Sequence, residues 1–388
     1  IFYTVDVDQT FRVCFSQKGA RLERYAISYF HQLDRLFDQN DVQLVTGKVV
    51  GDPPVSPAVM AANFLDDVGC FLSHMAQTTP DATYAQPGHV DGADAAYHDM
   101  ADLFGFAAQR PAYHYRCASP GAPTNAACFC EFAKRLNGFF HGEHPTRTTW
   151  FSPQEDQARV VPARTVYTGN TAFTASALQW FIPFAPLRLR MSGPTMGRLL
   201  RAAIGDRFAS ANLPMLHSRV LIDAGAAEFR PGVVEQAQRV DLADEFERQY
   251  YGDRMLFTIE RLIEAGYPQA DIAGEDVVRG LDVVGRDLRK RYAGKQSDVS
   301  ARMQRIAALL NAPSGWWHGR AELTDALASF ERFSHNIRHN FGVDSVGLRR
   351  IDDPDRRRAW DARQADAILR LKQDQKIWSD TLQRLRAD

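Results

Sequence analysis

The first ten residues, Ile1 to Thr10, constrain the fold most, because they join a short apolar run to two carboxylates. The run is aromatic and β-branched, which is typical of a buried parallel strand. Asp6 and Asp8 follow it, and strand side chains alternate with period two, so both acids share one side. Ligands of α/β sheets bind outside the carboxyl ends of the strands. The opening stretch therefore predicts an acidic pair at the ligand-binding edge of a sheet.

This acidic pair favours a divalent cation. Two carboxylates at this spacing repel each other unless a cation lies between them. Hard ions such as Mg²⁺ or Mn²⁺ take oxygen ligands and bridge carboxylates to substrate phosphates. The alternative is that the pair only caps a helix or lies in a solvated turn, and the Asp-x-Asp spacing alone does not decide between the two.

The predicted strand also bears on the chain as a whole. A parallel strand at the start of a sequence needs neighbours on both sides, and earlier βα units normally supply them. We therefore expect the sequence to be a fragment or a processed chain that lacks its N-terminal portion. Any nucleotide-binding half would lie in that portion.

The composition is that of an ordinary soluble globular enzyme. The chain has 388 residues, 45% hydrophobic and 24% charged, which suits two or three domains and a large core. A formal net charge of −1 gives no general attraction to nucleic acid or to an anionic membrane. No apolar run in the sequence is long enough to span a bilayer. The five cysteines are an odd number, which favours a reducing, cytoplasmic compartment over a disulfide framework.

The N-terminal part predicts two helices around a strand. Apolar spacing indicates a helix over 20–37 and a strand over 42–50. Ser56 and Pro57 have the pattern of an N-cap and a first helical residue, and the helix that they begin extends through Leu72.

Between residues 78 and 162 the periodicity weakens, and Gly, Pro, His and Ala dominate. So long a stretch is more often a functional insertion or lid than core. Its two nearest cysteines, Cys128 and Cys130, form a C-x-C, and the histidines match no zinc spacing, so we expect surface or substrate-contact residues. These histidines are His89, His98, His114, His141 and His144.

Regular structure returns near residue 165. Residues 165–168 are strand-like. Gly169 and Asn170 then begin a tight corner that leads into a predicted helix over 175–181.

An arginine-rich stretch follows this corner and includes Arg190. Pro194 is tolerated only in the first turn of a helix, so 196–203 is predicted to be helical. A strand over 207–212 leads on to Leu216-His217-Ser218-Arg219, which we expect to end a strand.

From residue 233 onward the sequence predicts an α-helical region whose apolar stripes serve packing. We therefore divide the chain into a catalytic domain over 1–232, with the insertion at 78–162, and a helical region over 233–388. The stripes indicate helices near 242–263, 277–292, 299–310 and 371–385.

This order of features resembles the second half of a GT-A-type glycosyltransferase, of the family-2-like or mannosylglycerate-synthase-like kind. The resemblance covers about residues 1–230 and implies an α/β fold with a mixed or parallel sheet and flanking helices. It also implies transfer of a sugar from a nucleotide-sugar donor to a small-molecule or glycan acceptor. It would carry binding of Mn²⁺ or Mg²⁺ to Asp6, Asp8 and His217, with Asp8 the more direct ligand. Gly169 and Asn170 would belong to the loop that meets donor sugar and acceptor.

The chain departs from that family at one helix start. Many members carry an acid where Ser192-Gly193-Pro194-Thr195 stands here, and inverting enzymes use that acid as the general base. Either the insertion supplies the base, with Asp94 and Asp99 as candidates, or the enzyme retains configuration. No catalytic residue is assigned. Arg190 and Arg219 are candidates to bind phosphate or acceptor oxygens bidentately.

Two other interpretations remain open. The opening Asp-x-Asp-x-Thr also fits haloacid-dehalogenase-like phosphatases, with Asp6 as nucleophile and Asp8 as acid/base. That fold needs acids on later strand ends, whereas Asp66 and Asp67 lie in a predicted helix, and Gln9 replaces the usual small residue. Alternatively, the helical region is an interaction module that pairs two copies of the chain or lies against a membrane. No strongly basic amphipathic face supports the membrane version.

Overall fold

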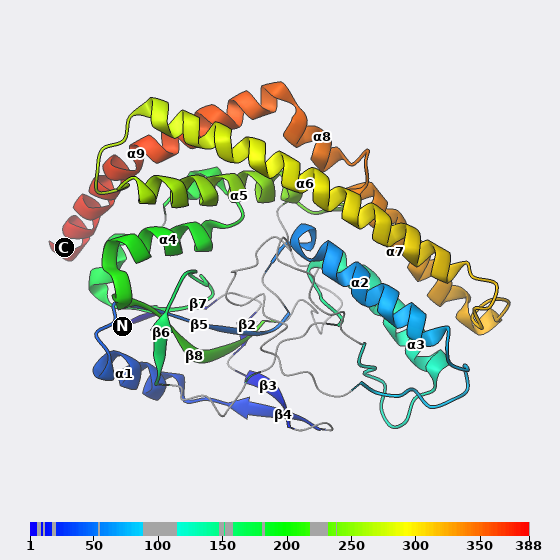
Figure 1. Ribbon diagram of the computed structural model, residues 1–388. Coiled ribbons are helices and arrows are strands. Elements are labelled where there is room, and N and C mark those ends of the chain that lie inside the picture. The colour runs from blue at the N-terminus through cyan, green and yellow to red at the C-terminus, as the bar shows by residue number, and fades with distance from the viewer. Residues whose placement is uncertain are drawn as a thin grey trace.

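The computed structural model describes residues 1–5, 9–10, 12–17, 21–52, 55–87, 115–146, 151, 158–180, 183–217, 232–237 and 239–387. A mixed sheet lies beneath stacked helices, and a long helical region extends beyond it (Figure 1). The predicted class, an α/β chain with flanking helices and an α-helical C-terminal region, is confirmed.

The described part of the main sheet has six strands. They are β1 (Phe2–Val5), β2 (Gln9–Thr10), β5 (Leu44–Gly51), β6 (Val160–Pro162), β7 (Asn170–Phe173) and β8 (Phe208–His217). Their order is β1-β7-β5-β8-β2, and β6 pairs with β8. Only β5 and β8 pair in parallel, and their carboxyl ends therefore lie at the same edge of the sheet.

The opening strand, β1, differs from the prediction of a buried parallel strand. It pairs antiparallel with β7, and it ends the order of the described strands. Phe2 is 47% exposed and stacks on Phe173 with ring centroids 5.5 Å apart. The prediction was wrong because a short apolar run fits a one-sided antiparallel strand as well as a buried one.

The predicted helix over 20–37 is correct only in its second half. Residues Arg21–Ala26 form strand β4, which pairs antiparallel with β3 (Arg12–Gln17), and α1 runs from Tyr29 to Gln39. Apolar residues three and four apart satisfied the helical pattern across both elements. The pairing of β4 with β3 is a contact that this local pattern does not contain.

The next two elements are as predicted. β5 matches the expected strand, and α2 (Pro57–Met75) begins where the Ser-Pro pattern indicates. The Ser56 side chain accepts a hydrogen bond from the backbone N–H of Ala58 at 3.1 Å. One orphan donor of the first turn is thereby satisfied, and the proline follows at the first helical position.

The described part of the stretch 78–162 is not peripheral. It forms α3 (Asn125–Arg135) and the 3-10 helix η2 (Leu136–His141). The rings of Phe129, Phe132, Phe139 and Phe140 are completely buried. Weak periodicity therefore did not mean exposure here, because these aromatic rings pack against helices from distant parts of the chain.

Two cysteines of this stretch contradict the expectation of free thiols. Cys117 and Cys128 form a disulfide, which ties the extended segment before α3 to the helix. Cys70 and Cys130 take no part in a disulfide among the described residues. An odd cysteine count could not reveal a single bond between residues brought together by the fold.

The segment from 165 to 217 shifts by a few residues from its prediction. The strand begins at Asn170 instead of Thr165, and the predicted helix after it is the 3-10 helix η3 (Ala175–Trp180). Helix α4 (Ser192–Ile204) contains Pro194 in its first turn, as expected. Strand β8 extends to His217, the last described residue before 232, which confirms that this histidine lies in a strand.

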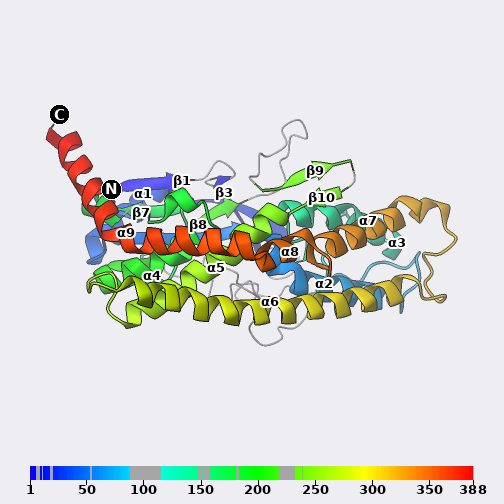
Figure 2. The same cartoon turned by 90° about the horizontal axis from the view of Figure 1, so that it is seen from above.

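The helical region consists of five long or medium helices in the described chain: α5 (Ala243–Glu264), α6 (Gly274–Leu310), α7 (Thr324–Phe341), α8 (Val346–Asp352) and α9 (Pro354–Ala387). The two helices predicted over 277–310 are one continuous helix, α6. A short hairpin, β9 (Val234–Gln236) with β10 (Arg239–Asp241), precedes them. Figure 2 shows α6 along the length of the molecule. Across the described ranges, no helix combines the length and the apolar character needed to cross a bilayer.

Candidate functional site

The candidate site is a cavity of about 300 Å³ beside the carboxyl ends of β5 and β8. It brings together three residues that the sequence pointed to separately, namely Gly169, Arg190 and His217. The first turn of α4 forms another wall, and α5 contributes Arg248 and Gln249. This position agrees with the general rule for ligands of α/β sheets.

His217 is fixed by a reciprocal pair of hydrogen bonds. Its side chain is buried, and Nδ1 lies 2.7 Å from the carbonyl oxygen of Asp52. A carbonyl can only accept, so Nδ1 carries the proton and a neutral ring has its lone pair on Nε2. The N–H of Asp52 donates in return to the carbonyl of His217 at 2.9 Å.

The chain turns at this point because residue 51 is glycine. Gly51 has a φ of +94°, and a Cβ there would collide with the carbonyl oxygen of His217. Any side chain would therefore disturb both the turn and the adjacent histidine. The Gly-Asp pair after β5 is thus part of the support for the site.

The predicted acids and one arginine lie outside the described residues: Asp6, Asp8 and Arg219. The residues on either side of the acidic stretch are described, however. Val5 is in register with Asn170 across β1 and β7, and Gln9 is in register with His217 across β2 and β8. The chain therefore leaves β1 beside one predicted site residue and enters β2 beside another.

Asn170 has a structural role in the sheet. It is completely buried, and its side-chain oxygen accepts from the Tyr3 hydroxyl at 2.8 Å. Its Nδ2 donates to the carbonyls of Lys48 at 3.0 Å and Leu213 at 2.8 Å. These carbonyls flank the irregularity between β5 and β8, where the ladder is interrupted. The amide thus replaces ladder hydrogen bonds, and this geometry does not support the predicted contact with donor or acceptor.

Gly47 makes room for this amide. A Cβ at that position would collide with the side chain of Asn170. The glycine within the strand therefore marks a close approach of another residue, as isolated strand glycines often do.

The first turn of α4 lies against the strand-like segment before β7. A Cβ on Gly193 would collide with the carbonyl of Val166, and a Cβ on Gly197 with that of Arg164. Small residues one turn apart thus allow the helix to approach the backbone closely. Ser192 and Pro194 line the cavity, so the positive end of the helix dipole points to this region.

Two arginines give the cavity positive charge. The N–H of Arg190 donates to the carbonyl of Arg248 at 3.3 Å, and Arg248 Nε donates to the carbonyl of Arg188 at 2.6 Å. Burial, followed by the charge of Arg190, lowers the pKa of Arg248. The carboxylate of Glu245 lies 4.0 Å from Arg190 Nη2 and offsets part of this charge.

The backbone that carries Arg190 is strained on both sides. Arg188 and Met191 have φ values of +50° and +67°, and Phe184 nearby has +62°. Residues other than glycine adopt this left-handed conformation at a cost, and it is concentrated at functional sites. Arg190 therefore lies between two strained residues, just before the first residue of α4.

Sequence reasoning missed Arg248. It lies in the helix predicted over 242–263, of which we interpreted only the apolar stripe, and it reaches the cavity because α5 packs against α4. Its helical spacing contains no signal that separates this cavity residue from an exposed charge.

A pair of carboxyl groups near the site was also missed. Asp52 follows the end of β5 directly, and its charge, after burial, raises the pKa of Glu143. An acid at the carboxyl end of a strand is a recognisable signal, although Glu143 joins it only through the fold.

The histidines of the predicted insertion do not form a common site in the described chain. His144 is fully buried, and its ring packs edge-on against Phe64 at 5.1 Å, which contradicts the surface position expected for it. His141 lies 3.7 Å from Glu235. The remaining three histidines, His89, His98 and His114, fall outside the described residues.

The acids that a phosphatase would need are placed on α2. Asp66 Oδ1 accepts from Arg302 Nε at 2.9 Å, and Asp67 is completely buried, with Oδ2 accepting from the Thr146 hydroxyl at 2.6 Å. Neither acid lies at a strand end. Within the described ranges, no three His, Cys, Asp or Glu side chains converge as a metal site.

Comparison with protein-family models, curated proteins and solved structures gave no match to this chain. The functional argument therefore depends on the cavity and its residues. Two guanidinium groups, the start of a helix and an oriented histidine form an arrangement suited to an anionic ligand.

Proposed function

We propose that the protein is a metal-dependent glycosyltransferase with a GT-A-like catalytic domain, which moves a sugar from a nucleotide-sugar donor to an acceptor. One observation carries this proposal. Gly169, Arg190 and His217, predicted from distant parts of the sequence, line one cavity at the carboxyl ends of the parallel pair β5 and β8. This is where the diphosphate of a nucleotide sugar would be recognised.

A divalent cation is part of the proposal. His217 Nε2 would hold it together with the carboxylates of Asp6 and Asp8. The bond from Nδ1 to the Asp52 carbonyl supports this role, because metal-ligating histidines are commonly oriented by such a bond at the other ring nitrogen. When bound, a Mn²⁺ or Mg²⁺ ion would offset negative charge on the diphosphate.

The chain's own groups would stabilise the leaving diphosphate. When the bond between the anomeric carbon and the diphosphate breaks, negative charge develops on phosphate oxygens. The guanidinium groups of Arg190 and Arg248 can donate charge-assisted hydrogen bonds to these oxygens. The first turn of α4 adds the positive end of its dipole.

Titration calorimetry with Mn²⁺ and a panel of UDP- and GDP-sugars tests the proposal. We expect at least one donor to bind in the presence of the metal, with affinity lost when EDTA is added. The proposal is wrong if no donor binds. Hydrolysis of an aryl phosphate, with trapping by beryllofluoride on Asp6, would indicate the phosphatase instead.

The cellular location is a separate part of the proposal. The cysteine count suggested the cytoplasm, but disulfides such as Cys117–Cys128 are rare in reducing compartments. We therefore propose that the chain acts in an oxidising compartment. Mass spectrometry of peptides alkylated before reduction tests this, because a bond present in the cell protects both thiols from alkylation.

A further inference from the structure

A second, larger concavity of about 790 Å³ lies next to the cavity and shares Leu189 and Arg248 with it. It is formed by the outer face of α5, the first turns of α9 and the strained segment around residue 188. We refer to it as the arginine groove, because Arg188, Arg248, Arg356 and Arg363 line it. The shared residues make the groove continuous with the proposed donor site.

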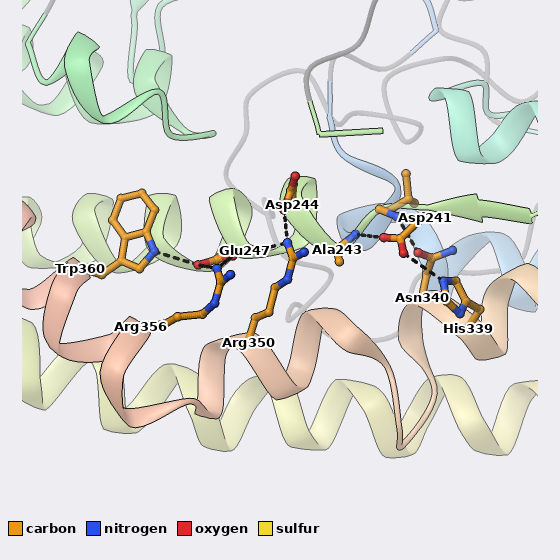
Figure 3. A network of polar contacts seen from close by, with 10 residues as sticks. Asp241, Ala243, Asp244, Glu247, His339, Asn340, Arg350, Arg356 and Trp360 are labelled. Carbon is orange, nitrogen blue, oxygen red and sulfur yellow. Dashed lines mark hydrogen bonds and ion pairs between the residues drawn. The ribbon is translucent and has the colours of Figure 1, made fainter. Parts of the chain in front are cut away.

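Contacts between side chains of α9 and α5 hold two of these arginines, Arg356 and Arg363, in place. Glu247 accepts from Arg356 Nη1 at 2.8 Å and 3.0 Å and from Trp360 Nε1 at 2.9 Å, as Figure 3 shows. The guanidinium of Arg363 lies over the Trp360 ring at 4.2 Å, while Tyr251 stacks on this ring at 4.6 Å. Both groups are therefore oriented before any ligand binds.

The charge of the groove is positive. Its lining contains four arginines and two carboxylates, those of Asp244 and Glu247. Both carboxylates also have Arg350 as a neighbour (Figure 3). Among the described residues, Arg188 and Arg363 form no ion pair, and both side chains are exposed. Their guanidinium donors are thus available to a ligand in the groove.

We propose that the arginine groove binds the acceptor of the transfer reaction and that this acceptor carries a phosphate group. The inference rests on the proposed function, since it takes the neighbouring cavity as the donor site. Phosphate suits the groove because its negatively charged oxygens can accept from several arginines at once, and arginine presents the planar fork that matches them. The volume is sufficient for a sugar phosphate or for a phosphorylated lipid headgroup.

The test measures direct binding of two probes to the full chain, without any donor. Glucose 6-phosphate is compared with glucose by calorimetry, and phosphatidylglycerol vesicles are compared with phosphatidylcholine vesicles by flotation. The variant R188Q/R363Q removes two groove charges that pair with no described carboxylate. The matched control is R358Q, on the same helix, which pairs with Asp355 and does not line the groove.

We expect the double variant to lose about tenfold or more in affinity for the phosphorylated probe, and R358Q to keep the wild-type affinity. Binding of glucose 6-phosphate would identify a soluble sugar phosphate, and binding confined to anionic vesicles would identify a lipid headgroup. The proposal is overturned if neither probe binds, or if the double variant binds as the wild type does. Because no donor is present, this result is independent of the calorimetry with nucleotide sugars, and either proposal can fail alone.

Discussion

The sheet-centred part of the molecule and its helical C-terminal region treat buried polar groups differently. In the helical region several of these groups pair with one another: Arg254 donates to Gln364 at 2.6 Å and to Asp361 at 2.5 Å. Asp253 accepts from Tyr292 and Gln249. Around the cavity, by contrast, Arg190 and Arg248 face each other beside one carboxylate.

This contrast separates polar groups that stabilise the fold from polar groups that are placed to bind a ligand. Paired polar groups fix helices to one another, because a buried group left unsatisfied costs more than the pair gains. Like charges held near each other, as around the cavity, destabilise the fold, and a bound anion would offset this repulsion. The helical region thus supports the sheet-centred part, and α5 contributes Arg248 and Gln249 to the lining of the cavity.

The largest loss of stability is expected when the buried polar contacts of Arg254 in the helical region are removed. Arg254 is 2% exposed, so Arg254→Ala removes a buried side chain, leaves the buried Gln364 without its donor and should reduce the free energy of unfolding by about 3–5 kcal/mol. Chemical denaturation measures this. Arg286→Ala, in an exposed pair with Asp282, should lose about 0.5 kcal/mol or less. Equal losses in the two variants would remove the contrast between buried and exposed pairing.

The next effect concerns the sheet. Asn170→Ala leaves the carbonyls of Lys48 and Leu213 without a donor, so we expect a loss of about 2–3 kcal/mol in unfolding free energy. Donor affinity of the protein that remains folded should not change, since the amide does not reach the cavity. Asn311→Ala, at the exposed end of α6, is the control. If Asn170→Ala instead weakened donor binding without changing stability, Asn170 would contact the substrate as first predicted.

His217→Ala tests the site itself. Because the ring is oriented by the Asp52 carbonyl, its removal should lower kcat/KM for the donor by about 10–100-fold. Steady-state kinetics with the donor identified by calorimetry measure this, and His335→Ala on the exposed face of α7 should leave the rate unchanged. An unchanged rate in His217→Ala would contradict the proposed role of the cavity.

The last effect is a pH dependence of stability that comes from Asp253. Burial raises the pKa of this carboxyl well above its ordinary value, so the folded chain binds the proton more tightly than the unfolded chain. Stability contributed by the group is therefore lost as pH rises above about 4, towards the folded-state pKa.

We accordingly expect Asp253→Asn to gain stability relative to wild type as pH rises from about 5 to 8. Tyr292→Phe removes a donor to the carboxyl, which should raise its folded-state pKa further and extend the fall in stability to higher pH. Denaturation curves across this range measure both variants. A difference between Asp253→Asn and wild type that is constant with pH would show that burial does not perturb this group.

Part of the site was predictable from single residues. His217 in a strand, Pro194 in the first turn of a helix and Gly169 at a corner of the chain all came from local patterns. Arg248 was not predictable, because its helical spacing is the same whether a neighbouring helix leaves it in solvent or brings it to a cavity. Asn170 was predicted to contact the ligand, but its side-chain amide forms hydrogen bonds at the irregularity between β5 and β8 instead.

The sequence by itself determined the helices with strong periodicity, the Ser56 cap and the strand positions around β5 and β8, because each depends on neighbours within one or two turns of the chain. Only the tertiary structure decided that β1 pairs antiparallel, that Cys117 meets Cys128 and that the arginines of α5 and α9 line one groove. These contacts join residues far apart in sequence, and their energies depend on which surfaces the fold brings together.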